Sequence, residues 1–209
     1  MSAGTLPRST VPKRADYRDY RDDLRKDFHC TCGYCSIWES EAEGIGFEID
    51  HYLPKEGHPD LVNDFLNLVW SCRPCNRYKW DWDPNDPRFK PDEIVFRPDQ
   101  HVRSEHFAPA PNYEISGTTQ LGLFTCRRLR LNRPLLKRLR ECRERDAKAE
   151  RVIKDGLRRV RGLAHKIDSV PPELRGDVLR LRAELEQAAT EIHDAVDEII
   201  PKEPRSRLY

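Results

Sequence analysis

Two pairs of cysteines with the same short spacing constrain the fold of this chain more than any other feature. Cys32 and Cys35 form the first Cys-x-x-Cys pair, and Cys72 and Cys75 form the second, with 36 residues between the pairs. Four thiolates in two such pairs are a common ligand set for one tetrahedral zinc ion. We therefore expect a structural Zn2+ that holds together two segments far apart in the sequence.

Other interpretations of the cysteines are less favoured. Cys30 offers another thiol two residues before Cys32. We prefer Cys32, because the two-residue spacing lets backbone amides donate hydrogen bonds to the sulfurs. A redox role would require a thioredoxin-like strand and helix around the pair, and that setting is absent from the pattern.

We expect a cytoplasmic protein without a membrane segment. The chain has seven cysteines, an odd number, and paired spacing of this kind in a reducing compartment indicates a metal site more than a disulfide framework. No stretch reaches the ~18 consecutive apolar residues that a membrane span requires. Residues 1–13 do not resemble a signal peptide.

The charges of the chain are balanced overall but unevenly distributed. The formal net charge is +1. Residues 127–166 carry sixteen Lys or Arg and five Asp or Glu, whereas residues 36–110 carry eight basic and fifteen acidic residues. A basic helical segment beside an acidic segment suits a phosphate-binding face next to a metal site. A solvated helix with a skewed surface explains the same pattern, so charge alone gives little support to nucleic acid.

Apolar periodicity predicts an α+β fold in three parts. Residues 1–28 would form a flexible arm (to about residue 15) and an amphipathic helix, and residues 29–112 a metal-bearing core with an irregular wrap. Within that core we expect short strands at 47–49 and 66–70 and a helix at 75–80. Residues 113–209 would be mainly α-helical. There, two long helices joined by a Pro-containing link would form an antiparallel helical hairpin.

The stretch from residue 32 to residue 79 contains four motifs in a specific order. They are Cys-Gly-Tyr-Cys (32–35), Ile-Asp-His-Tyr-Leu-Pro-Lys (49–55), Asn-Leu-Val-Trp-Ser-Cys (67–72) and Cys-Asn-Arg-Tyr-Lys (75–79). This stretch resembles the zinc-containing HNH endonucleases of the ββα-metal fold. The resemblance implies a small zinc-bound core and a metal-dependent endonuclease. Such an enzyme hydrolyses DNA phosphodiester bonds and leaves a 5′ phosphate and a 3′ hydroxyl.

The resemblance assigns roles to four polar residues. His51 would be the general base that takes a proton from the attacking water. Asp50 would bind a divalent cation that stabilises the charge developing at the scissile phosphate. Asn67 would orient His51 and hold the loop between the strands. Asn76 falls on a family position that is often His; its carboxamide oxygen suits a hard cation such as Mg2+, and the residue also fits a helix cap.

Basic and aromatic residues near the expected helix each allow two interpretations. Arg73, Arg77 and Lys79 would contact phosphates next to the scissile one, or they are ordinary exposed charges. Trp80 and Trp82 are predicted to pack against the zinc module, because large aromatic residues dominate small cores. Stacking on nucleobases is the alternative for both tryptophans.

Looser matches extend the resemblance into the second half of the chain. The matching segments are 86–89, 101, 106–107, 115–117 and 129–133. They are similar to HNH nucleases with a helical tail that accompany bacterial anti-phage systems such as retrons. This similarity implies a role in anti-phage defence. The helical hairpin would then clamp DNA, form a homodimer or dock a protein partner such as an ATPase or another defence-system component.

A catalytically inactive, zinc-stabilised module that binds DNA or protein is the main rival interpretation. Such a module would keep the cysteines and the fold and lose turnover. The set of Asp50, His51 and Asn67 argues against it, because a pure binder has no need of a base beside a carboxylate.

Overall fold

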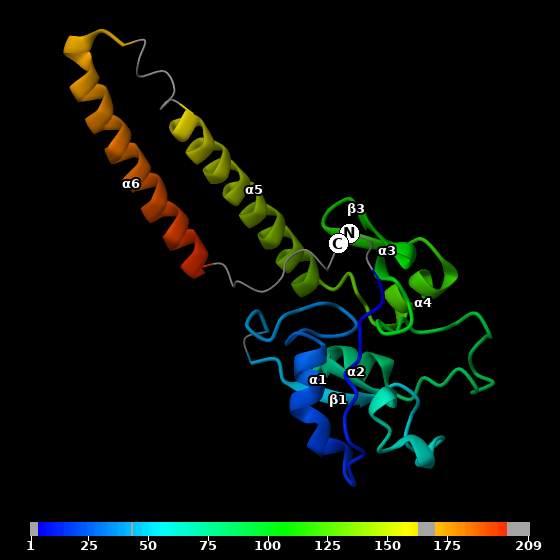
Figure 1. The fold of residues 1–209 in the computed structure, drawn as a ribbon. Helices are drawn as coiled ribbons and strands as arrows, with labels where there is room; N and C mark the ends of the chain where they lie inside the picture. Colours follow the sequence, from blue (N-terminus) through cyan, green and yellow to red (C-terminus); the bar gives the residue numbers. More distant parts are fainter. Residues whose placement is uncertain (1–3, 43, 163–169, 200–209) are drawn as a thin grey trace. The chain divides into compact units, whose positions relative to one another are not determined.

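The structure, a computed structural model, describes residues 4–42, 44–162 and 170–199, and it divides into two compact units. One unit runs to Leu139 and the other begins at Arg140. The structure thus groups residues 113–139, which the sequence pattern assigns to the helical region, with the first unit. Figure 1 shows the elements of both units coloured along the chain.

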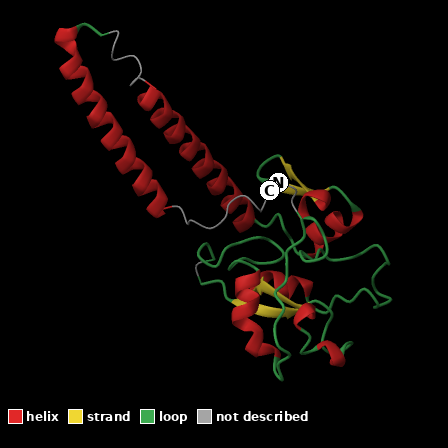
Figure 2. Ribbon diagram, viewed as in Figure 1, coloured by secondary structure: helices red, strands yellow, loops and turns green. Residues whose placement is uncertain are grey.

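The first unit contains a two-stranded antiparallel sheet followed by a helix (Figure 2). β1 (Phe47–His51) pairs with β2 (Leu68–Cys72), and β2 continues without a loop into α2 (Arg73–Lys79). The predicted order of strand, loop, strand and helix is confirmed. It sets the second cysteine pair across the junction of β2 and α2, and it sets Asp50 and His51 at the end of β1.

Short helices precede the sheet and interrupt the long β1–β2 loop. η1 (Tyr17–Tyr20) runs directly into α1 (Arg21–Asp27), which confirms the amphipathic helix predicted in this region. Its apolar spacing buries Tyr20, Leu24 and Phe28 in the core. The β1–β2 loop contains η2 (Pro59–Leu61) and η3 (Phe65–Asn67).

The described part of the N-terminal arm is bound to the first unit, so the prediction of a flexible arm is wrong. The guanidinium of Arg8 donates to the main-chain oxygens of Phe65, at 2.8 Å, and Leu68, at 3.0 Å. It also lies 3.4 Å from the carboxylates of Asp27 and Asp99. A buried arginine is tolerated only when it is paired and hydrogen-bonded in this way.

A second small sheet spans the boundary at residues 112 and 113 between the predicted irregular wrap and the predicted helical region, neither of which was expected to contain a strand there. Its two strands pair in antiparallel fashion, with a short helix before them and a longer helix after them. A Cβ atom at Gly122 in the longer helix would lie 2.0 Å from the main-chain oxygen of His106, so only glycine allows this close approach. In chain order the elements are α3 (Arg103–His106), β3 (Phe107–Ala110), β4 (Glu114–Gly117) and α4 (Gln120–Arg128).

Two long helices account for most of the second unit, and they confirm the long helices predicted there. α5 (Pro134–Gly162) starts in the first unit, and η5 (Pro172–Leu174) leads into α6 (Arg175–Ile199). The predicted helix break at 168–169 lies outside the described residues. None of the described helices is both long and apolar enough to cross a membrane. With its short sheets, several helices and cysteine cluster, the chain has the predicted α+β fold.

Candidate functional site

The four predicted zinc ligands come together in one cluster. The sulfur atoms of Cys32, Cys35, Cys72 and Cys75 all lie within 4.8 Å of one another, and those of Cys35 and Cys72 are 3.7 Å apart. Two sulfurs bound tetrahedrally to one zinc at about 2.3 Å are about 3.8 Å apart, so the spacing and the thiol chemistry fit this ion. The cluster includes Cys32 and excludes Cys30, as predicted. These four cysteines can bind a metal such as zinc.

An arginine that the sequence pattern did not single out faces the cysteine cluster. Arg133, directly before α5, places one guanidinium nitrogen 3.6 Å from the sulfur of Cys35, 3.7 Å from that of Cys72 and 3.5 Å from that of Cys75. Burial opposes its charge, but the negative sulfurs outweigh this effect and raise the pKa of Arg133 above its ordinary value. A zinc ion with four thiolates carries two net negative charges, so Arg133 offsets part of that charge.

We expect Arg133→Gln to weaken zinc retention by about 10- to 100-fold, the usual effect of removing a partner of a metal ligand. Competition with a chromogenic chelator measures it directly. Arg138→Gln is the matched control, because Arg138 is exposed on α5. Equal zinc release from the two variants would show that Arg133 does not stabilise the bound ion.

The carboxylate of Asp50 is buried between two hydrogen-bond donors. The Tyr34 hydroxyl donates to Oδ2, and the Lys79 ammonium lies 3.1 Å from Oδ1. Burial raises the pKa of Asp50 above its ordinary value, although Lys79 and Tyr34 pull it down. Burial, followed by the charge of Asp50, also raises the pKa of Tyr34, so the phenol keeps the proton that it donates.

Lys79 is not available for phosphate contact, which corrects its predicted role. Its side chain is fully buried, and its ammonium donates to the main-chain oxygen of His51 at 2.9 Å as well as contacting Asp50. The reason is helical geometry: Lys79 lies four residues after Cys75, on the inward face of α2. Its role is to position the end of β1.

Removing the Lys79 charge should strongly destabilise the fold. We expect Lys79→Met to lower the free energy of unfolding by about 3–5 kcal/mol, because it leaves the buried Asp50 carboxylate without its cation. Urea unfolding of the zinc-loaded protein measures the change. Lys90→Met, at an exposed position, should change it by less than about 0.5 kcal/mol. If Asp50→Asn combined with Lys79→Met does not recover stability, the pairing argument is wrong.

His51 is held by a main-chain carbonyl that fixes its tautomer. Its Nε2 lies 2.8 Å from the main-chain oxygen of Val62. The ring of Tyr17 packs edge-on against the imidazole, with 4.7 Å between the ring centroids. A carbonyl oxygen can only accept, so Nε2 carries the proton and Nδ1 keeps its free lone pair. Burial lowers the pKa of His51 below its ordinary value of 6.5, which favours the neutral ring near neutral pH.

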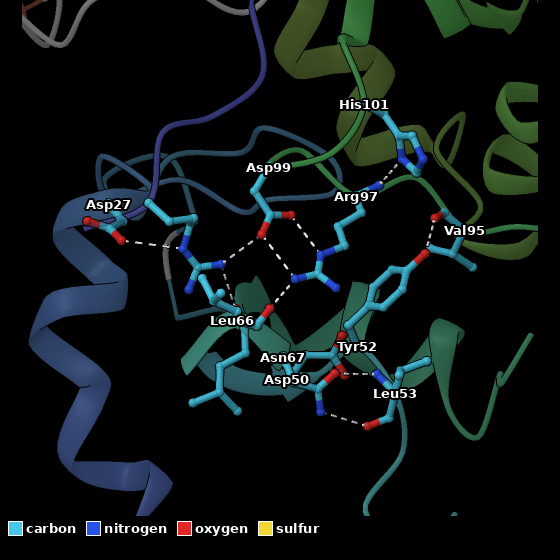
Figure 3. Close-up of polar contacts among 12 residues, drawn as sticks. Asp27, Asp50, Tyr52, Leu53, Leu66, Asn67, Val95, Arg97, Asp99 and His101 are labelled. Carbon is cyan, nitrogen blue, oxygen red and sulfur yellow. Dashed lines mark hydrogen bonds and ion pairs between the residues drawn. The ribbon is translucent and has the colours of Figure 1, made fainter. Parts of the chain in front are cut away.

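Asn67 holds the β1–β2 loop in place. Its Oδ1 accepts from the main-chain nitrogen of Leu53 at 2.9 Å, and its Nδ2 donates to the oxygens of Leu53 (3.1 Å) and Leu61 (3.3 Å). Figure 3 shows the pair of bonds to Leu53. Leu61 is next to Val62, which bonds His51. The predicted loop-holding geometry is therefore present, and Asn67 influences the position of His51 through the loop.

A groove of about 980 Å³ runs past the ends of β1 and α2. Asp50, His51 and Asn76 line it together with Arg77, whereas Arg73 is absent from the lining. Arg73 instead donates to Glu48 at 2.8 Å, and the Asn76 side-chain nitrogen donates to the same carboxylate at 2.9 Å. These bonds outweigh the effect of partial burial and lower the pKa of Glu48. Glu48 lies two residues before Asp50 in β1. Because alternate residues of a strand lie on the same face, the predicted strand already placed Glu48 on the face of Asp50.

The donor atoms in this groove fit a hard divalent cation. Asp50 and Asn76 supply carboxylate and carboxamide oxygens, which are the ligands such ions prefer. Oδ2 of Asp50 is bonded to Tyr34 and Oδ1 to Lys79, and a carboxylate offers about four lone-pair positions, so acceptor capacity remains. The Asn76 nitrogen is bonded to Glu48, which leaves the side-chain oxygen of Asn76 as the donor available to a cation.

The two tryptophans that follow α2 differ from each other. Trp82 is fully buried, as predicted, and its indole nitrogen donates to the main-chain oxygen of Glu93 at 2.9 Å. Trp80 is 70% exposed and lines the groove, so the prediction that it packs in the core is wrong. Trp80 directly follows the last residue of α2, and its side chain lines the same groove as that of Asn76.

A curated protein has a sequence similar to that of this chain. The chain is similar to the Septu protein PtuB of Bacillus thuringiensis. The two sequences are 33% identical over 102 residues, which cover 48% of this chain and 36% of that relative. The chain thus matches little more than a third of the length of PtuB. No family model matches the chain.

Proposed function

We propose that this chain is a metal-dependent nuclease that hydrolyses phosphodiester bonds in DNA. The observation that carries the proposal is the geometry of His51: its Nε2 lies 2.8 Å from a main-chain carbonyl oxygen, which leaves Nδ1 as an acceptor, and the ring lines a groove with oxygen donors. A neutral imidazole with one free nitrogen is what a general base needs near neutral pH. The resemblance of residues 32–79 to HNH endonucleases assigns that role to the same residue.

In this proposal His51 acts through Nδ1. The bond from Nε2 to Val62 persists while Nδ1 accepts the proton of a water molecule, so the ring keeps its orientation as it becomes charged. Lys79 holds the main-chain oxygen of His51, and Asn67 holds the loop that carries Val62. These contacts keep the base in place without contacting the substrate.

Asp50 and Asn76 would hold the catalytic Mg2+ or another divalent cation in this proposal. When bound, such a cation stabilises the negative charge that develops on the phosphate and the leaving oxygen. Asp50 is pre-positioned by Tyr34 and Lys79, and Asn76 by its bond to Glu48. Arg77 is exposed at the groove, where it would pair with a phosphate of the substrate. Arg73, whose side chain is partly exposed beside Glu48, would contact a phosphate further along.

A role in anti-phage defence is part of the proposal. Its support is the similarity to Septu protein PtuB and the looser resemblance to nucleases of anti-phage systems. A protein partner, such as an ATPase or another defence component, fits the same role, as does a homodimer. The second unit leaves large apolar side chains exposed on and just before α6: Leu174, Leu179, Leu181, Leu185 and Ile192. Size-exclusion chromatography with light scattering distinguishes self-association from a monomer that awaits a partner.

The rival function is a zinc-stabilised module that binds DNA or protein without cutting. Plasmid cleavage in the presence of Mg2+ or Mn2+ separates the two functions. Cleavage that depends on His51 supports the nuclease. DNA binding without cleavage under either metal supports the binding module.

A further inference from the structure

Trp80 differs from every other tryptophan of the chain in its environment. Its side chain is 70% exposed, whereas Trp38, Trp70 and Trp82 are at most 6% exposed. Burying an indole is a large source of stability, so one exposed tryptophan in a unit that buries the other three has no role in the core.

The backbone of Trp80 is held in a conformation that large residues seldom adopt. α2 ends at Lys79, and Trp80 follows with φ 51° and ψ −130° while its N–H still donates to the oxygen of Asn76 at 2.9 Å. A positive φ at a bulky residue is unfavourable and is retained where the surrounding structure imposes it, often at functional sites. In this turn Trp82 enters the core while the indole of Trp80 remains outside it.

The groove that Trp80 lines also carries cations that face solvent. Lys55 and Arg77 are exposed in its lining, and among the described residues neither forms an ion pair. Three of the four acidic groups of the lining are paired with cations that are not part of it: Asp50 with Lys79, Glu48 with Arg73, and Asp81 with Arg88 and Arg128. The fourth, Glu56, is exposed, and the lining holds three cations that form no ion pair among the described residues: Arg21, Lys55 and Arg77. The excess of positive charge left in the groove suits the phosphates of a nucleic acid.

We propose that Trp80 stacks on an unpaired nucleobase, so that the preferred substrate is single-stranded nucleic acid next to the cut. This proposal rests on the proposed function, since it places the base beside the phosphate at His51. Base–aromatic stacking with a basic groove along the backbone is how single strands are bound without sequence preference. In a continuous duplex both faces of each base are already covered by neighbouring bases, so the indole has no face to meet.

Equilibrium binding tests the proposal without relying on cleavage. The zinc-loaded protein carries His51→Ala, and the probes are a fluorescein-labelled single-stranded oligothymidylate and a labelled duplex of equal length. Fluorescence anisotropy measures the binding of each probe without added Mg2+ or Mn2+. We expect tighter binding of the single strand. Trp80→Ala should weaken single-strand binding by about 5- to 150-fold, which corresponds to about 1–3 kcal/mol for one stacked base. Duplex binding should change by less than about twofold.

Trp80→Phe is the matched control, because it keeps an aromatic face at the same place. We expect it to restore most of the single-strand affinity that Trp80→Ala loses. All variants should retain bound zinc and the melting temperature of the parent, since the side chain is exposed. An oligouridylate probe in parallel shows whether RNA single strands bind as DNA does.

Two outcomes overturn the stacking proposal: single strand and duplex bind equally, or Trp80→Ala weakens both equally. Either result leaves the nuclease proposal intact if His51 is needed for cleavage. Conversely, a Trp80-dependent preference for single strands in a protein that cuts nothing supports stacking and contradicts the nuclease. The two proposals therefore fail separately.

Discussion

Replacing His51 with alanine should lower the rate of plasmid cleavage by about 10²- to 10⁴-fold, which is the usual contribution of a general base. The variant removes the Nδ1 atom that we propose to take the proton and leaves Asp50, Asn76 and the cysteines in place. Conversion of supercoiled plasmid to nicked and linear forms in Mg2+ or Mn2+ measures the effect. Zinc content and the unfolding transition should match the wild type.

His58 provides a control for loss of an imidazole near the site. It belongs to the same loop but bonds Asp83 at 2.7 Å and does not line the groove. His58→Gln, which can keep that hydrogen bond, should retain cleavage within about twofold, as expected for a change outside the site. If His51→Ala cuts as well as His58→Gln, the mechanism proposed for His51 is wrong.

Removing the metal from the cysteine cluster should unfold the first unit. The cluster joins the turn after α1 to the junction of β2 and α2, and all four cysteines lie in the core. Binding of structural zinc contributes about 10–16 kcal/mol of apparent free energy in small zinc domains, more than the total stability of most domains. We expect Cys72→Ser, or treatment with a strong chelator, to abolish the cooperative unfolding transition and to release zinc.

Two cysteines outside the cluster serve as controls for this experiment. Cys30 lies two residues before Cys32, and Cys142 lies in α5. Cys30→Ser and Cys142→Ser should each keep one equivalent of zinc and a transition close to that of the wild type. Loss of zinc from Cys30→Ser alone would show that Cys30 is a ligand. Retention of zinc by Cys72→Ser would contradict the four-cysteine site.

The parts of the fold that the sequence predicted correctly depend on local patterns. The spacing of the cysteine pairs, the alternation in β1 and β2 and the apolar stripe of α1 are each visible within a few residues. The second sheet was missed because Pro109 and Pro111 interrupt the strand signal in a short hairpin. The contacts of Arg8 were not predicted, because its partners lie about 20 to 90 residues further along the sequence.

The candidate site shows where residue type alone misleads. A lysine in a short helix is expected to be exposed and a tryptophan buried, yet Lys79 is buried and Trp80 is exposed. Helical spacing explains Lys79, because Lys79 shares one face of α2 with Cys75. Trp80 follows the end of α2 with a positive φ, which the sequence pattern does not predict. The partners of Arg133 could not be predicted in this way, since the cluster that it contacts forms only when the chain has folded.

The N-terminal arm also determines where a fragment of this protein can begin. Leu6 and Arg8 attach it to Pro98 and to the main chain around η3 and β2. A fragment that starts at the first cysteine pair would leave Asp99 without its bond to Arg8 and would lack Asp27 altogether. Because Asp99 lies 91 residues after Arg8, this segment can dock fully only after the chain has been synthesised beyond residue 99.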